Sequence, residues 1–323
     1  MSYLLYLVFL LLLPFKSSSL SSPNRAMLQR RLVKSAYELN NVDRITPATY
    51  SNRANLTITP IIENAVWSCD RSFFWNNIDV SCRSTLLFDS NTLFVHSPVH
   101  LDVELKSTVD RIIFEKKITK LIVLTTNYEH LKFVPEWYLG YGGIDNDNPS
   151  LEVKFFGCPG IRAKVPDVVW DGEIGGEEEL WDYNVLEPLH VSCERLPGTD
   201  KPFFNEVVFF MRKHGVFVAT DLYWNYPKRS GINPTLTSKS DWGEWELAPS
   251  ATVPLSSRLW KFGMDKVYQP VFNNVMVKDK REFERVKDTI LRWGAEVVVP
   301  SHGDIIRGKE GCEEALLKHF GRM

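Results

Sequence analysis

Three apolar runs of the chain are each followed by side chains that can bind a metal ion. The runs are residues 121–124, 216–220 and 296–299, and the side chains that follow them are Glu129, His130, Asp221 and His302. Side chains at the carboxyl end of a central strand in an open α/β sheet project into the crevice where ligands bind. Carboxylates and imidazoles suit zinc and non-haem iron. The pattern therefore indicates a metal site, provided that the fold brings these strand ends together.

A ββαβ pattern precedes the first of these strand ends. Residues 85–88 and 92–96 are β-forming runs separated by the turn Asp89-Ser90-Asn91, which predicts a hairpin that starts the sheet. Apolar residues then recur at helical spacing between Leu101 and Ile113. Because such a helix is a crossover connection, the strand at 121–124 is predicted to run parallel to its neighbour.

The rest of the chain alternates between strand-like and helix-like segments. Strands are predicted at 151–156 and 185–191, a hairpin at 206–211 and 216–220, helices at 257–272 and 281–293, a last strand at 296–299 and a closing helix at 309–320. The stretch 171–182, rich in Glu and Gly, is typical of a solvated loop. The Trp-rich stretch 223–254 is typical of a long surface loop.

Length and composition describe an ordinary globular protein with no charge signal for nucleic acid. The 323 residues are 44% apolar and carry a formal charge of -2. Five cysteines are scattered without a CxxC pair, so neither a zinc ribbon nor a dense disulfide framework is indicated. Cys69 and Cys82 can pair in an oxidising compartment, and the sequence leaves their pairing open.

Residues 1–37 are interpreted as a targeting segment. Residues 1–15 are almost wholly apolar but fewer than the ~20 needed to span a bilayer, and residues 16–37 are basic, rich in serine and free of acidic side chains. Together they are typical of a signal peptide followed by a transit peptide, the two-part address of some plastids. A secretory leader, or a membrane anchor at residues 1–15, is the alternative. A polar connector (38–60) and a single domain without a predicted membrane span (61–323) follow.

The order of the candidate ligands resembles that of the metallo-β-lactamase fold superfamily. Glu129 and His130 match the last two residues of its His-x-His-x-Asp-His motif, Asp221 in ATDLYW matches its bridging Asp, and His302 in VVPSHGD matches its terminal His. The resemblance covers residues 85–304 and implies an α/β (α+β) fold, a four-layer αββα sandwich with the metal site at the edge between its two sheets. The segments YEHLKF and TDLYWNYP are also similar to a poorly characterised branch found in bacteria and photosynthetic eukaryotes.

The chain departs from the family pattern where a second metal would bind. Thr126 or Asn127, together with Tyr128, stand where the motif has its first two imidazoles, and Thr199 stands where a later Pro-Gly-His turn has the third. In the two-metal family these three imidazoles belong to one metal. The resemblance therefore implies a mononuclear site held by the four residues that follow the strand ends.

Such a site implies a metal-dependent hydrolase with one zinc or iron ion and a small-molecule substrate that the sequence does not identify. Zinc lowers the pKa of a bound water to about 7. Glu129 and Asp221 are the candidate catalytic residues: Asp221 would act as a ligand, and Glu129 either as a further ligand or as a general base. The opposing interpretation, supported by the lost imidazoles, is a degenerate, metal-free sandwich that serves as a binding or scaffold protein. The sequence indicates no oligomeric state.

Overall fold

The computed structural model describes residues 58–71, 73–75, 78–80, 82–142, 149–176, 178–226 and 255–321. The predicted targeting segment (1–37), nearly all of the predicted connector and most of the Trp-rich stretch lie outside these residues. The first strand begins at Thr59, at the end of the predicted connector. No helix within the described ranges is long and apolar enough to cross a membrane.

The first sheet contains seven of the strands that the structure describes. Their order is β1 (Thr59–Ile62), β2 (Val66–Arg71), β5 (Cys82–Asp89), β6 (Thr92–His96), β7 (Lys120–Thr125), β8 (Glu152–Gly157) and β9 (Gly172–Glu173). Neighbours are antiparallel from β1 to β6 and parallel from β6 to β9. The predicted hairpin of β5 and β6 is confirmed, and so is the parallel crossover to β7 through helix α3 (Val103–Glu115).

The sheet begins two strands earlier than predicted. The strand β2 was not predicted because its composition is not that of a buried strand. Its residues VWSCDR include a serine, an aspartate and an arginine, yet every residue except Asp70 is buried. Charged side chains are almost never fully buried unless they are paired. Asp70 pairs with Arg83 and Arg71 pairs with Asp102, so the charges of β2 are compensated by residues outside the strand, which its own pattern does not show.

The second sheet follows the predicted strands closely. Its order among the described residues is β10 (Leu186–His190), β11 (Val207–Met211), β12 (Val216–Ala219), β13 (Val297–Pro300) and β14 (Ile306–Arg307). The hairpin of β11 and β12 is confirmed, and β12 pairs with β13 in parallel, whereas the other neighbours are antiparallel. The carboxyl ends of β12 and β13 therefore lie at the same edge of this sheet.

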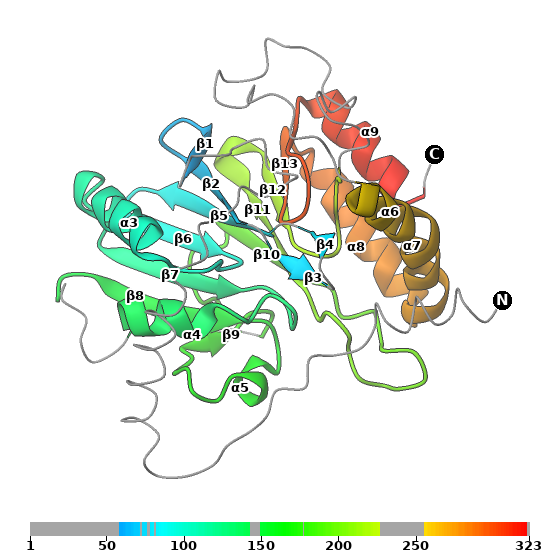
Figure 1. Cartoon of the computed structure of the whole chain (residues 1–323), viewed down its shortest axis with the longest axis horizontal. Helices are drawn as coiled ribbons and strands as arrows, with labels where there is room; N and C mark the ends of the chain where they lie inside the picture. Colours follow the sequence, from blue (N-terminus) through cyan, green and yellow to red (C-terminus); the bar gives the residue numbers. More distant parts are fainter. Residues whose placement is uncertain are drawn as a thin grey trace.

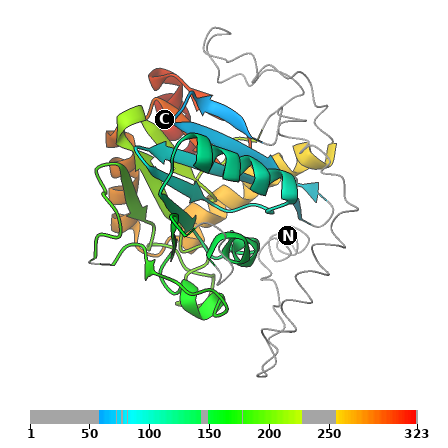
Figure 2. The same cartoon turned by 90° about the vertical axis from the view of Figure 1, so that its left-hand side faces the viewer.

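Alternating side chains of β11 show how the layers pack. Val207 and Phe209 join the core between the two sheets, whereas Val208 and Phe210 face the helices α8 (Lys280–Trp293) and α9 (Lys309–His319). Figure 1 shows these helices on one side of the strands and α3 on the other, and Figure 2 shows α3 lying across the outer face of the first sheet. The predicted four-layer αββα sandwich is confirmed.

Shorter elements complete the described chain. They are the hairpin of β3 (Phe74–Trp75) and β4 (Ile78–Asp79), the helices α4 (Val134–Trp137) and α5 (Ile161–Lys164), the turns η2 (Tyr138–Gly142) and η3 (Arg212–His214), and the helical stretch α6 (Leu255–Gly263), η6 (Met264–Tyr268), α7 (Gln269–Val271) and η7 (Phe272–Met276). The predicted helix at 257–272 corresponds to this last stretch.

Two segments predicted to be loops at the surface contribute to the core. The stretch 171–182 contains β9 and also Trp181, whose ring packs 6.2 Å from that of Phe209 between the sheets. At the start of the Trp-rich stretch, Tyr223, Trp224 and Tyr226 are at most 6% exposed. Aromatic side chains gain more from burial than any other residues, and this gain outweighs the polar composition around them.

All five cysteines are free thiols, including the two whose pairing the sequence left open. In the register of β2 and β5, Cys69 lies opposite Ser84 and Cys82 lies opposite Arg71. The two thiols are thus diagonal rather than direct neighbours on adjacent strands. Burial raises the pKa of each of them to about 12, which disfavours the thiolate form that thiol chemistry requires.

We expect His319, the last residue of α9, to weaken the fold in mild acid. His319 Nε2 lies 2.8 Å from the Leu222 carbonyl oxygen, and burial lowers the pKa of this imidazole to about 4. The unfolded chain, with a pKa of about 6.5, binds more protons between these values, so stability falls as the pH drops through this window. Urea unfolding should show a loss of about 1–3 kcal/mol from this residue, and His319→Gln should reduce the acid-induced loss of stability by that amount.

The control for this experiment is His100→Gln. A hydrogen bond with Glu136 raises the pKa of His100, so its removal should leave the acid-induced loss in place. An unchanged dependence on pH in His319→Gln would contradict the assignment.

Candidate metal centre

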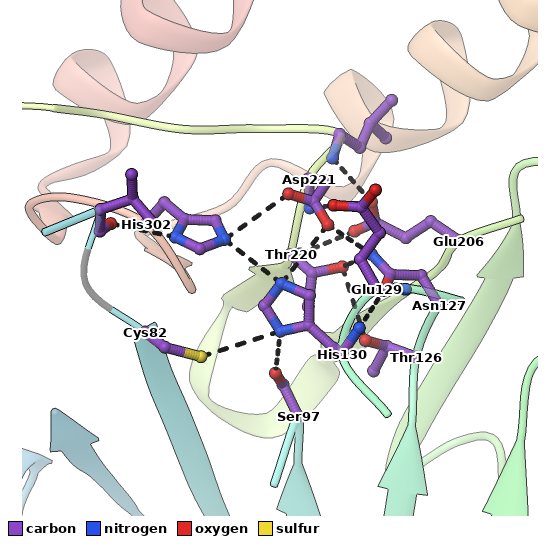
Figure 3. Close-up of polar contacts among 12 residues, drawn as sticks. Cys82, Ser97, Thr126, Asn127, Glu129, His130, Glu206, Thr220, Asp221 and His302 are labelled. Atoms are coloured by element: carbon purple, nitrogen blue, oxygen red, sulfur yellow. Dashed lines mark hydrogen bonds and ion pairs between the residues drawn. The ribbon is translucent and has the colours of Figure 1, made fainter. Parts of the chain in front are cut away.

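Three of the four predicted ligands converge at the edge where the two sheets meet (Figure 3). His130 follows β7 of the first sheet, and Asp221 and His302 follow β12 and β13 of the second. His130 Nε2 lies 3.2 Å from His302 Nε2 and 3.3 Å from Asp221 Oδ2, and His302 Nε2 lies 3.5 Å from Asp221 Oδ1. Among the described residues, no other group of three such side chains brings its ligand atoms within 4.8 Å of one another.

The three side chains fit a single small cation. Two ligand atoms bound about 2.1 Å from a tetrahedral ion lie about 3.4 Å apart, close to the three separations in this cluster. The exposed fractions of the side chains are only 7%, 13% and 10% for His130, Asp221 and His302. Two imidazoles and one carboxylate form a donor set of catalytic zinc and of non-haem iron, and this set leaves positions for water and substrate.

Both imidazoles are oriented by contacts of their Nδ1 atoms. His302 Nδ1 lies 3.2 Å from the Val80 carbonyl oxygen. Because a carbonyl only accepts, Nδ1 of the neutral ring carries the proton and Nε2 presents a lone pair. His130 Nδ1 lies 2.5 Å from Ser97 Oγ, and Ser97 follows β6 in a left-handed conformation with φ of 54°. Outer hydrogen bonds of this kind fix the tautomer and orientation of metal-binding histidines.

Asn127 stands where the family motif would place an imidazole. Counted back from His130, that motif has its first two imidazoles at Thr125 and Asn127, so Tyr128 is at neither position. The Asn127 side chain is fully buried, and its amide nitrogen donates to Asp221 Oδ2 at 2.6 Å. Its oxygen accepts hydrogen bonds from two backbone N–H groups of the turn that carries His130. This amide therefore ties the His130 turn to the Asp221 turn across the two sheets.

Glu206 holds the Asp221 turn from inside the protein. Its buried carboxylate accepts the backbone N–H groups of residues 220–222 at 2.6, 2.9 and 2.6 Å. Burial and the charge of Asp221 raise the pKa of Glu206, and these N–H donors oppose the rise. Burial alone would also raise the pKa of Asp221, but the positive charge and the hydrogen bonds that His130 and His302 offer in their protonated forms outweigh it and hold that pKa well below its usual range. Asp221 is therefore ionised at neutral pH.

Arg83 of β5 reaches across to the turn that carries His302. Its guanidinium group donates to the carbonyl oxygens of Pro300 at 2.6 Å and Gly303 at 2.8 Å. It also pairs with Asp70 at 2.7 Å, and the two side chains are only 3% and 6% exposed. Gly303 has a φ of 93°, and a Cβ atom there would lie 2.2 Å from a neighbouring backbone oxygen. The turn therefore has little freedom to move His302.

Glu129 lies beside the cluster and is not one of the three converging ligands. Two effects raise the pKa of Glu129: burial of its carboxylate by protein atoms, and the nearby negative charge of Asp221. Its side chain keeps an exposed surface, so water limits this rise. A carboxylate with a raised pKa beside a metal site is better suited to accept a proton than to serve as a ligand.

Thr199, which was aligned with a lost imidazole, lies in an exposed turn and donates its hydroxyl to the Leu196 carbonyl oxygen at 3.0 Å. The sequence reasoning did not identify the residues that orient the ligands, which are Ser97, Arg83, Asn127 and Glu206. Two of them did carry a signal. Arg83 lies two residues before the β-forming run 85–88, and Glu206 directly precedes the wholly apolar VVFF. Charges in such positions are buried only with compensating partners.

No protein-family model and no curated protein sequence matches the chain. Among solved structures, the metallo-β-lactamase from Pontibacter korlensis is 12% identical over 80% of this chain and 97% of its own, with a TM-score of 0.46. The rubredoxin oxygen:oxidoreductase of Desulfovibrio gigas is 15% identical over 82% of this chain and 61% of its own, with a TM-score of 0.48. The metallo-β-lactamase FIM-1 from Pseudomonas aeruginosa, in its mono-zinc form, is 11% identical over 82% and 95%, with a TM-score of 0.41. These matches are likenesses at low sequence identity, and the architecture rests on the strand order and layers described above.

Proposed function

We propose that this protein binds one divalent metal ion through His130, Asp221 and His302 and hydrolyses a small molecule there. The observation that carries the proposal is the set of separations between the ligand atoms, 3.2, 3.3 and 3.5 Å. Three side chains from two different sheets meet at the spacing that one tetrahedral ion requires. Asn127 occupies a position where a second metal would need an imidazole, which supports a single ion.

Each residue of the site has a separate role in the proposed hydrolysis. When bound, a zinc or iron ion would act as a Lewis acid that lowers the pKa of water and polarises a substrate oxygen. Ser97 and the Val80 carbonyl orient the two imidazoles, so that both Nε2 atoms face the ion. Glu129, beside the cluster and with a raised pKa, accepts the proton that the attacking water loses.

A metal-free binding or scaffold protein is the second candidate, and one observation favours it. Asp221 Oδ2 already accepts a hydrogen bond from Asn127, and the two imidazoles lie within hydrogen-bond distance of each other. If Ser97 donates to His130 Nδ1, His130 Nε2 carries a proton that it can donate to His302 Nε2. In this arrangement the cluster is satisfied without an ion.

Metal titration of the purified chain separates the two candidates. After treatment with a chelator, the protein should take up about one equivalent of zinc or iron(II), and X-ray absorption should detect two imidazoles in the ligand shell. Turnover of an ester or phosphodiester should appear with the metal and disappear with the chelator. Uptake of less than about a tenth of an equivalent would overturn the metal site and favour the scaffold.

A further inference from the structure

Tyr268, the last residue of η6, has a buried hydroxyl group without a partner. The side chain is 5% exposed, and its hydroxyl makes no hydrogen bond to any residue that the structure describes. Most buried polar groups are hydrogen-bonded, and exceptions need an explanation. Tyr141, which is 3% exposed, shows the usual arrangement, because its hydroxyl donates to Asp110 at 3.0 Å.

The ring of Tyr268 packs near two aromatic residues whose chain segments adjoin the proposed metal centre. The ring lies 6.2 Å from that of Phe204 and 5.7 Å from that of Trp224. The Phe204 carbonyl accepts the backbone N–H of Tyr128, next to Glu129, and Trp224 follows Asp221 by three residues. Tyr268 is therefore packed against the segment that carries Asp221 and against Phe204, which is bonded to the segment that carries Glu129.

The electrostatic surroundings make this hydroxyl a hydrogen-bond donor. Burial, and then the negative charges of Asp221 and Glu129, raise the pKa of the Tyr268 phenol well above its usual value, and the charges of Glu194 and Glu206 act in the same direction. The phenol therefore keeps its proton. Four carboxylates around it also disfavour an anionic partner, whereas an uncharged acceptor oxygen meets no such repulsion.

We propose that Tyr268 Oη donates a hydrogen bond to the carbonyl oxygen of an uncharged acyl substrate, such as an ester or an amide, held at the metal centre. This inference rests on the proposed hydrolytic function and narrows it to one substrate class. The disfavoured alternative is a phosphodiester, because its negative charge lies on the oxygens that would accept the hydrogen bond from Tyr268. Tyr268 is thus a substrate-binding residue supplied by the helices that cover the second sheet.

The test uses the full chain loaded with cobalt(II), whose visible absorption reports ligands that enter its coordination shell. Acetohydroxamate, which offers a carbonyl oxygen, and inorganic phosphate are titrated into the wild type, Tyr268→Phe and Tyr141→Phe. We expect Tyr268→Phe to bind acetohydroxamate about 3- to 10-fold more weakly, the loss of one hydrogen bond, with phosphate affinity unchanged. Its thermal midpoint should not fall, because no intramolecular bond is lost.

The matched control separates binding from folding. Tyr141→Phe should lower the thermal midpoint, because it removes the bond to Asp110, and should leave acetohydroxamate affinity unchanged. If cobalt-loaded Tyr268→Phe bound acetohydroxamate as tightly as the wild type, the role of Tyr268 would be overturned and the proposed function would stand. The same holds if Tyr268→Phe lowered the thermal midpoint as much as Tyr141→Phe does. An equal weakening of phosphate would overturn the acyl substrate class. A wild type that takes up no cobalt would overturn the proposed function as well.

Discussion

His302→Ala is expected to weaken metal binding about 100-fold or more, equivalent to about 2.7 kcal/mol. The substitution leaves His130 and Asp221 as the only members of the converging group, and two ligands do not hold a catalytic zinc ion in proteins, which use three. Isothermal titration of the stripped protein with zinc measures the change directly. Thermal unfolding provides a second measurement, because a ligand that binds only the folded state raises its stability in proportion to the logarithm of its concentration.

The matched control for this experiment is His214→Ala. His214 lies in η3, between β11 and β12, and belongs to no group of converging ligands among the described residues. The wild type and His214→Ala should both gain thermal stability as zinc is added, and His302→Ala should need about 100-fold more zinc for the same gain. Retention of one equivalent of zinc at wild-type affinity in His302→Ala would remove this residue from the site.

Arg83→Met is expected to lower the free energy of unfolding by about 3–5 kcal/mol, which is the range observed when one residue of a buried ion pair is removed. The substitution leaves the carboxylate of Asp70 and the carbonyl oxygens of Pro300 and Gly303 buried without the donor that now satisfies them. The free energy of unfolding in urea measures this cost. Since the same guanidinium group fixes the turn of His302, zinc affinity should fall together with stability.

An exposed ion pair of the same chemistry provides the comparison. Arg285 and Glu282 lie one turn apart on α8, with side chains 55% and 26% exposed. Arg285→Met should change stability by about 1 kcal/mol or less, as is typical of surface pairs. If Arg83→Met costs no more than Arg285→Met, neither the buried pair with Asp70 nor the hydrogen bonds of Arg83 to the His302 turn contribute the expected stability. Arg83→Lys keeps the charge but loses the two-branched geometry, and should recover only part of the stability.

The sequence predicted those parts of the fold that depend on local pattern. The β11–β12 hairpin and α8 were placed to within about two residues, because continuous apolar runs, period-3.6 patterns and the turn residue Gly294 are local signals. The same patterns located Asp221 and His302 just beyond β12 and β13. Family resemblance then supplied the expectation that these strand ends meet.

The residues that complete the site could not be predicted, because their partners are remote in the chain. Arg83 binds carbonyl groups 217 and 220 positions away, and Asn127 binds Asp221 across 94 positions. In the sequence each is an ordinary polar residue just before or just after a β-forming run. β2 was missed because its charged residues are compensated by partners outside the strand, Arg83 for Asp70 and Asp102 for Arg71.

The placement of the ligands on two sheets has a consequence for the order of folding. His130 and His302 are separated by 172 positions and come from opposite sheets, and contacts between such distant segments carry a large loop-closure cost. The complete cluster can therefore form only after the sheets have docked. An ion bound there would slow unfolding without speeding the early steps of folding, so its contribution would be to the lifetime of the folded state.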